Sequence, residues 1–353
     1  MSRIAVTGAA GPVGRRLCAL LAADPDVEVV RAVDRHRFHP PSGLDADARR
    51  RIEAHRVQLK DADLDALLEG VDVVCHLAGS DPLEGNAVDH DLGTTSRLLE
   101  AADRTGVGQL IVRSSATVYG AWPDNPIPLT EGTELRPNPE TPWVQVRVRI
   151  EDRIQAFADA HPDVAVAVLR PCVTVSESGS DELGRVLAAA RVVAPPDASS
   201  PAQFVHADDV AAAVDVVRRA RASGAFNVAP EGSIDAERIR ALVGGSPRIP
   251  VPAWLARRLT DIGWRYQLAP TPPGFLPYVS APWVVASDRL RALGWEPTST
   301  NDEAFVASHG AAPWAQISPQ RRQEIALGVA AAAILGAGAA TAAVVRRRLR
   351  AQP

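Results

Sequence analysis

Apolar and polar residues alternate along the first half of the chain in blocks that suit strands and helices in turn. Short continuous apolar runs, typical of buried strands, are separated by longer stretches with apolar residues at helical spacing. Strand–helix alternation of this kind predicts an α/β fold with a doubly wound parallel sheet. The predicted strands cover residues 3–7, 27–33, 71–77, 109–114 and 164–169, and the clearest helices cover 13–23, 62–68 and 94–105.

The pattern changes twice further along the chain. After residue 171 the strands and helices follow one another less regularly, which predicts a second, smaller unit. Residues 325–345 then form a stretch of 21 residues without a charged side chain. At ~1.5 Å per residue this helix would be about 31 Å long, close to the hydrocarbon thickness of a bilayer. We predict a transmembrane helix here; the alternative is an alanine-rich helix that docks on the protein or on a second subunit.

Composition and charge exclude several classes of function. The chain has 38 basic and 42 acidic residues, a net charge of −4, and its arginines are scattered, so no nucleic-acid partner is expected. Cys18, Cys75 and Cys172 form no C-x-x-C pair, and no histidines and carboxylates have metal-ligand spacing, so we predict no metal. The first residues lead directly into a strand-like run, and with the unpaired cysteines this predicts a cytoplasmic location.

A glycine-rich turn follows the first predicted strand and opens the first predicted helix. Residues 7–14 read Thr-Gly-Ala-Ala-Gly-Pro-Val-Gly. Gly8 permits the tight turn, Gly11 lets the backbone approach a pyrophosphate, and Gly14 lets the helix pack closely on the strand. The phosphates would bind at the helix N-terminus. The predicted cofactor contacts in this turn are Gly8, Ala10, Gly11, Pro12, Val13 and Gly14.

The acidic residue that such a dinucleotide site requires is Asp34, which ends the second predicted strand twenty residues beyond Gly14. A carboxylate at this place accepts hydrogen bonds from the adenosine ribose and repels a 2′-phosphate, so the predicted cofactor is NAD. Arg35 and Arg37 could receive that phosphate, which keeps NADP as the less favoured choice.

Further motifs stand at fixed places along the chain. They read His76-Leu77-Ala78-Gly79, Ser114-Ser115-Ala116-Thr117-Val118-Tyr119-Gly120, Leu169-Arg170-Pro171, Phe204-Val205-His206-Ala207-Asp208-Asp209-Val210 and Leu293-Gly294-Trp295-Glu296-Pro297. With the glycine turn, they resemble the extended short-chain dehydrogenase/reductases, the NAD-dependent epimerase/dehydratase family. The resemblance implies a Rossmann-type sheet, a smaller C-terminal substrate domain for a small molecule such as a nucleotide sugar, and a homodimer. It also implies further cofactor contacts from Arg35, Gln58, Leu59, Leu77, Ala78, Gly79, Ser114, Arg147 and Pro171.

The resemblance also divides the chain into parts. Residues 1–175 would form the NAD(P)-binding Rossmann domain, to which the segment around 203–230 returns, and 176–310 the substrate-binding domain. A linker at 311–324 would lead to the predicted transmembrane helix at 325–345 and to a basic tail at 346–353. Four aromatic residues of the second part could line a substrate pocket or pack its core: Trp254, Trp264, Tyr278 and Trp283.

The catalytic pair of this family has no direct counterpart in the chain. Family members use Tyr-x-x-x-Lys, in which the lysine lowers the pKa of the phenol that moves the proton. Lys60 is the only lysine and no tyrosine precedes it by four residues; Trp143 and Arg147 stand at the matching positions. An indole N–H donates only and cannot be an acid/base, whereas Arg147 could still hold a ribose hydroxyl.

Two functional hypotheses follow. In the first, the protein is an NAD-dependent epimerase, dehydratase or reductase, with Ser115 polarising a carbonyl and Tyr119 or a substrate group supplying the proton. In the second, it is a catalytically inactive, membrane-tethered dinucleotide-binding sensor or scaffold. The glycine turn, Asp34 and Ser115 support cofactor binding under both hypotheses, and Trp143 and Arg147 favour the second.

Overall fold

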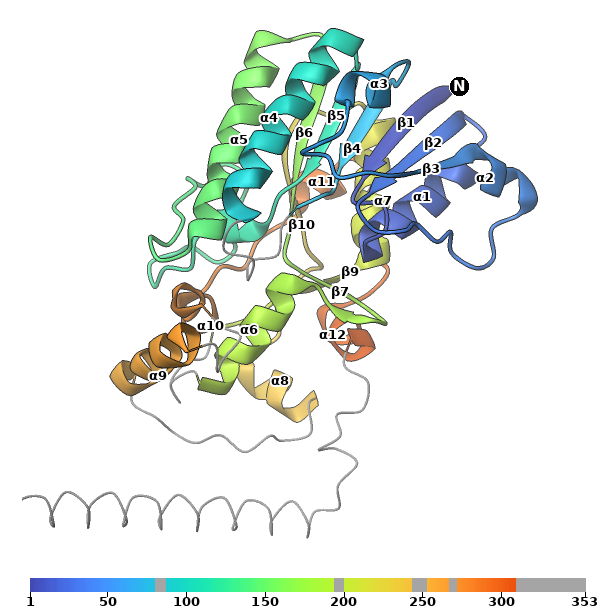
Figure 1. Cartoon of the computed structure of the whole chain (residues 1–353). Coiled ribbons are helices and arrows are strands. Elements are labelled where there is room, and N and C mark those ends of the chain that lie inside the picture. Colours follow the sequence, from blue (N-terminus) through green and yellow to red (C-terminus); the bar gives the residue numbers. More distant parts are fainter. Residues whose placement is uncertain (80–86, 194–199, 243–252, 267–271, 309–353) are drawn as a thin grey trace, which may run out of the picture.

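The computed structural model describes residues 1–79, 87–193, 200–242, 253–266 and 272–308, which form a layered α/β domain with a smaller unit beneath it (Figure 1). Seven parallel strands make the central sheet, in the order β10-β6-β5-β4-β1-β2-β3. Their bounds are β1 Ser2–Thr7, β2 Val27–Asp34, β3 Ile52–Arg56, β4 Val73–His76, β5 Gln109–Arg113, β6 Ala165–Pro171 and β10 Gly224–Val228.

The middle strands of this sheet are buried on both faces, which is why they stand in the sequence as continuous apolar runs. All four residues of β4 are buried, as are four of the five residues of β5. The five predicted strands correspond to β1, β2, β4, β5 and β6, so the predicted doubly wound parallel sheet is confirmed.

Helices cover both faces of the central sheet (Figure 1). On one face α1 packs against α7 and α2, and on the other α4 packs against α5 and α3. Each face therefore has its own apolar core between sheet and helices. The bounds are α1 Pro12–Ala23, α2 Ala46–Arg51, α3 Leu64–Leu68, α4 Ala87–Thr105, α5 Pro142–Ala160 and α7 Ala207–Arg219.

The smaller unit contains a mixed three-stranded sheet in the order β8-β7-β9. Its strands are β7 Val173–Ser176, β8 Gly179–Ser180 and β9 Phe204–His206. Helices of this part of the chain are α6 Glu182–Val193, α8 Ala236–Leu242, α9 Ala253–Arg265, α10 Pro277–Ser280 and α12 Asn301–Ser308, while α11 Asp288–Arg291 lies beside β10. Two 3-10 turns, Ala116–Tyr119 and Pro273–Phe275, complete the described elements.

The predicted C-terminal helix at 325–345, the linker at 311–324 and the basic tail at 346–353 lie outside the described residues. Within the ranges that are described, we find no helix that is both long and apolar enough to cross a membrane. The homodimer concerns a second chain and stays a prediction.

Candidate functional site

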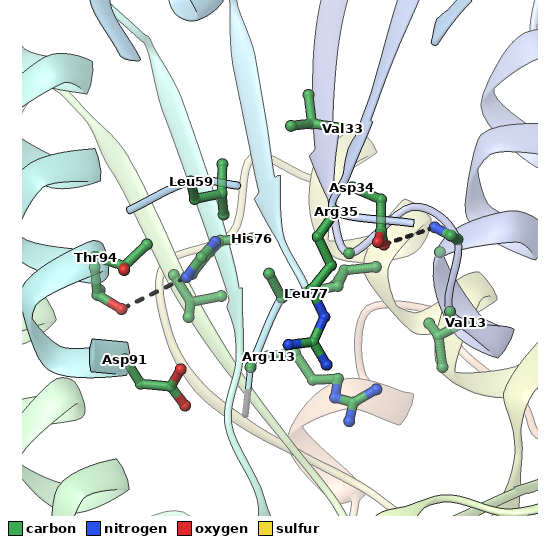
Figure 2. A pocket seen from close by; sticks show the side chains of 18 of the residues that line it. Val13, Val33, Asp34, Arg35, Leu59, His76, Leu77, Asp91, Thr94 and Arg113 are labelled. Atoms are coloured by element: carbon green, nitrogen blue, oxygen red, sulfur yellow. Dashed lines mark hydrogen bonds between the residues drawn. The ribbon is translucent and has the colours of Figure 1, made fainter. Parts of the chain in front are cut away.

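A cavity of about 850 Å³ opens at the carboxyl ends of the central strands (Figure 2). It lies where the strand order reverses between β1 and β4, the place where open α/β sheets bind ligands. Every cofactor-binding or catalytic residue predicted from the sequence lines this cavity except Tyr119. These residues are Gly8, Ala10, Gly11, Pro12, Val13, Gly14, Asp34, Arg35, Gln58, Leu59, Leu77, Ala78, Gly79, Ser114, Ser115, Trp143, Arg147 and Pro171.

The glycine turn has no room for side chains at two of its positions. Gly8 adopts a φ of +72°, and a Cβ on it would lie 2.7 Å from the backbone nitrogen of Ala78. A Cβ on Gly14 would overlap the carbonyl oxygen of Gly8. α1 begins at Pro12, and its N-cap residue Gly11 has no side chain to occupy the N–H groups of the first turn. The turn therefore presents those N–H groups to an anion.

Asp34 stands at the end of β2, where two backbone N–H groups orient its carboxylate, and Figure 2 draws one of these bonds. Ala10 donates to Oδ2 over 2.9 Å, and His36 donates to Oδ1 over 2.8 Å. The first bond ties the carboxylate to the glycine turn. Arg35 and Arg37 line the same cavity.

Ser115, Trp143 and Arg147 enter the cavity from the segment after β5 and from the first two turns of α5. The Ser115 hydroxyl accepts a hydrogen bond from Thr117 Oγ1 over 3.0 Å, which leaves its own proton to be donated elsewhere. The Arg147 guanidinium lies over the Trp143 ring, 4.3 Å from the ring centre. The four-residue spacing thus places both side chains on one face of α5.

Arg147 is a buried cation. The residue is 8% exposed, and its Nε has no hydrogen-bond partner among the residues that the structure describes. Burial lowers the pKa of Arg147 to about 10, so the guanidinium stays charged at neutral pH. The guanidinium lies close to the backbone of Gly79, where an added Cβ would be 2.8 Å from Arg147 Nη2. Arg147 lines the cavity, so its guanidinium brings a positive charge and N–H donors to the site of a bound ligand.

Comparison with known proteins assigns the family. Residues 4–229 match the model of the NAD dependent epimerase/dehydratase family. The chain belongs to this family. An uncharacterized protein of Mycobacterium tuberculosis is 25% identical over 311 residues, covering 86% of this chain and 82% of that protein. An uncharacterized UDP-glucose epimerase of Bacillus subtilis is 31% identical over 150 residues, covering 38% of this chain and 46% of that protein.

Solved structures share the fold of this family member. UDP-glucose 4-epimerase from Bifidobacterium longum, in complex with NAD+ and UDP, has a TM-score of 0.65 at 19% identity, covering 87% of this chain and 97% of that chain. UDP-glucuronic acid 4-epimerase from Bacillus cereus, in complex with NAD, has a TM-score of 0.63 at 18% identity, covering 86% and 96%. At these identities the likeness establishes the Rossmann-like fold.

Tyr119, which the sequence offered as a substitute acid, does not line the cavity of this epimerase/dehydratase-family protein. The residue is buried, and its hydroxyl donates to Asn227 Oδ1 over 2.8 Å while it accepts from Arg170 Nη1 over 2.7 Å. Burial raises the pKa of Tyr119, against the opposing effect of Arg170. The only proton of the phenol is therefore bonded to an internal amide.

A buried ion pair continues this network to the cavity wall. Arg170 donates to Glu151 Oε2 from Nη2 over 2.6 Å and from Nε over 3.0 Å. The Ser114 hydroxyl donates to the other oxygen of the same carboxylate over 2.5 Å. All three residues are buried, and Ser114 lines the cavity, so the ion pair holds the wall at the end of β5.

His76 lines the cavity as a neutral ring (Figure 2). It contacts Thr7 Oγ1 through Nδ1 at 2.7 Å and Thr95 Oγ1 through Nε2 at 3.5 Å. Burial lowers the pKa of His76 from 6.5 to about 4, with Asp91 and Arg147 adding smaller, opposing effects. Between pH 6.5 and about pH 4 the unfolded chain binds a proton at this histidine that the folded chain does not. The free energy of unfolding therefore falls as the pH falls through this range.

We therefore expect wild-type protein to lose up to about 1.4 kcal/mol of unfolding free energy per pH unit below pH 6.5, relative to His76→Gln. Glutamine keeps polar atoms near both threonines but does not titrate. Urea unfolding of the two proteins at pH 7 and at about pH 5 checks this difference. Parallel pH profiles for the two proteins would show that the histidine is not buried in its neutral form.

Sequence reasoning missed several charged residues that line the cavity. They include Asp91, Arg113 and Asp181, and His36 lines the cavity as well. Arg113 ends β5, so the carboxyl-end rule for parallel strands would have found it. Asp91 on α4 and Asp181 before α6 carry no local signal, because only the tertiary fold brings them here. Five cationic side chains face three carboxylates in the lining, an excess that suits an anionic ligand.

The aromatic residues considered for a substrate pocket lie elsewhere. Tyr278 and Trp283 are buried and pack edge to face with ring centres 5.7 Å apart. Trp254 and Trp264 are exposed on the smaller unit. None of the four lines the cavity described above.

One cluster of metal-ligating residue types occurs in the described ranges. Glu177, His206 and Asp208 bring ligand atoms within 4.8 Å of one another. Arg16 forms ion pairs with both carboxylates, at 2.5 Å from Asp208 and at short range from Glu177. A guanidinium thus already supplies the positive charge, and the cluster connects α1 to the smaller unit.

Proposed function

We propose that the chain binds NAD in the cavity together with a nucleotide-sugar-type ligand, and that the phenol-based proton transfer of its family is missing. The observation that carries the proposal is the convergence of the glycine turn, Asp34, Ser115, Trp143 and Arg147 on one cavity. Two solved structures of the same fold hold NAD, and one of them also holds UDP, which supports this choice of ligands.

The residues present fit the dinucleotide. Gly8 and Gly14 keep the turn open at positions where a Cβ would collide with backbone atoms. The carboxylate of Asp34 stands where the fold binds an adenosine ribose, and its charge favours NAD over NADP. Arg147 lines the cavity as a cation and offers guanidinium donors to a ribose hydroxyl.

NAD, when bound, supplies the acceptance and return of a hydride. Ser115 would donate a hydrogen bond to the oxygen of the reacting carbon, and Arg147 would orient the ribose as a permanent cation. Trp143 takes the tyrosine position of the family, and its indole N–H can donate but cannot exchange a proton near neutral pH. Tyr119 is committed to Asn227 and Arg170. The geometry therefore favours a dinucleotide-binding sensor or scaffold.

A second candidate is an epimerase or dehydratase that takes its acid from a group on the substrate. Ser115 favours it, because this hydroxyl lines the cavity and could still polarise a carbonyl. Substrate-assisted turnover needs no phenol in the protein. The two candidates differ in whether the wild-type chain reduces its cofactor.

The test mixes NAD-loaded protein with UDP-glucose or UDP-glucuronic acid and follows conversion of the sugar nucleotide, because an epimerase or dehydratase returns the hydride to its substrate and accumulates no reduced nicotinamide. We expect wild type to be at least about 100-fold slower than Trp143→Tyr/Arg147→Lys, because a positioned acid/base contributes ~10²–10⁴-fold. Tyr119→Phe is the matched control and should leave the wild-type rate unchanged. Wild-type turnover as fast as that of the double variant would support the second candidate instead.

A further inference from the structure

The outer face of α9 carries an unusual number of exposed aromatic and aliphatic side chains. Trp254 is 67% exposed and Ile262 is 44% exposed, and Trp264 and Tyr266 are exposed close by. The remaining exposed large apolar residues of the described ranges are scattered singly over other elements: Met1, Leu20, Ile127 and Val306. Single residues of that kind are ordinary, whereas a cluster indicates an interaction surface.

The exposed residues of α9 follow one stripe of the helix. Trp254, Arg258, Ile262 and Arg265 are spaced by four, four and three residues, which places them on the same side. All four are exposed, while Leu255 is only half-buried on the adjoining side. The stripe does not take part in the cavity described above. Any partner of this stripe is therefore different from the ligands proposed for the cavity.

We propose that this stripe, Trp254–Arg258–Ile262–Arg265, lies on an anionic membrane surface. Tryptophan and tyrosine place an apolar ring and a polar N–H or O–H at the boundary between lipid tails and water. Arginines bury their methylene stems beside such rings and reach anionic headgroups with their charged ends. Two arginines against the single carboxylate of Asp261 give this exposed face a positive excess.

The position of α9 and the sequence beyond the described residues support this partner. α9 lies at the outer edge of the smaller unit, on the side away from the central sheet (Figure 1). The described chain ends at Ser308 in α12 of the same unit. Sixteen residues, 309–324, separate it from the uncharged segment 325–345. A linker of that length reaches about 50 Å, which is enough for the segment to enter the bilayer that α9 touches.

A second copy of the chain is the competing occupant, because tryptophan and arginine are also enriched in protein interfaces. The positive excess of the stripe favours the anionic surface, since pairing the stripe with itself would bring like charges together.

The test is flotation of the full chain carrying Leu335→Arg with lipid vesicles. This substitution puts a charge in the middle of 325–345 and opposes its insertion, so that binding through α9 is measured separately. We expect this protein to float with phosphatidylcholine vesicles that contain phosphatidylglycerol, and much less with phosphatidylcholine alone. Further substitution of Trp254→Ser and Ile262→Ser should weaken the partitioning about tenfold.

The matched control replaces Ile127 and Leu20 by serine, because their exposures of 60% and 40% are close to those of Trp254 and Ile262. We expect this control to float like its parent. A Leu335→Arg protein that does not float, or that floats equally well after Trp254→Ser/Ile262→Ser, would overturn the proposal. A lipid-free dimer that Trp254→Ser dissociates in sedimentation would assign the stripe to a second copy and overturn it too.

Discussion

Replacing Gly14 with alanine is expected to lower the affinity for NAD by about 100-fold, equivalent to about 3 kcal/mol. The added Cβ would overlap the carbonyl oxygen of Gly8 and lie 2.7 Å from the Cα of Ala9. Both are backbone atoms, so α1 and the glycine turn must move apart. The turn presents its N–H groups to the phosphates only while that packing holds. Calorimetric titration of NAD into the variant measures the loss.

Two other glycines provide a control and a milder variant of the same turn. Gly93 lies in α4, where a Cβ would meet nothing within 4 Å, so Gly93→Ala should bind NAD as wild type does. Gly11→Ala would bring its Cβ to 3.3 Å from the carbonyl oxygen of Gly8, a contact that small shifts can relieve. We expect Gly11→Ala to keep the fold. Its affinity for NAD should still fall, because the added methyl group lies where the pyrophosphate approaches the backbone. Equal affinities for Gly14→Ala and Gly93→Ala would refute the role assigned to this turn.

Arg170→Ala is expected to cost about 3–5 kcal/mol of unfolding free energy, because it leaves the buried Glu151 carboxylate without its cation. The same change removes the hydrogen bond that Arg170 donates to Tyr119. Urea unfolding monitored by tryptophan fluorescence gives the free energy, provided that the denaturant slope is unchanged. We expect the Arg170–Glu151 pair to be the main interaction that stabilises the cavity lining around Ser114.

Two comparisons isolate the buried charge as the cause. Arg104 and Asp65 form an ion pair of similar length, 2.7 Å, on the surface, so Arg104→Ala should leave the unfolding midpoint nearly unchanged. The double variant Arg170→Met/Glu151→Met removes both charges and should recover much of the lost stability. If Arg170→Ala were as stable as Arg104→Ala, the ion pair would not contribute as described.

The sequence predicts the central sheet well, because burial on both faces leaves an unmistakable apolar run. It identifies neither edge strand as a strand, although it returns the segment around 203–230, which contains β10, to the domain of this sheet. β3 reads Ile-Glu-Ala-His-Arg and β10 reads Gly-Ala-Phe-Asn-Val, and neither is a continuous apolar run. An edge strand has one open side and can carry polar residues, so only its pairing with β2 or β6 reveals it.

The candidate site divides in the same way. The glycine turn and Asp34 can be predicted from the sequence. The turn lies between a strand and a helix that are adjacent in the chain, and Asp34 lies at the end of the following strand, where this fold brings it to the turn. The environment of Tyr119 does not follow, because Asn227 and Arg170 come from distant strands. Neighbouring Ser115 points into the cavity, whereas the phenol four residues later is enclosed by the core.

The central claim, that this cavity is an NAD site, is tested most directly by calorimetric titration of NAD and NADH into the full chain and into Asp34→Ala. We predict binding in the micromolar range for the wild type and about tenfold weaker binding for the variant, from loss of the ribose hydrogen bonds. A folded wild-type protein that gives no heat with either nucleotide would contradict the account, and the fold would then serve as a scaffold without its cofactor.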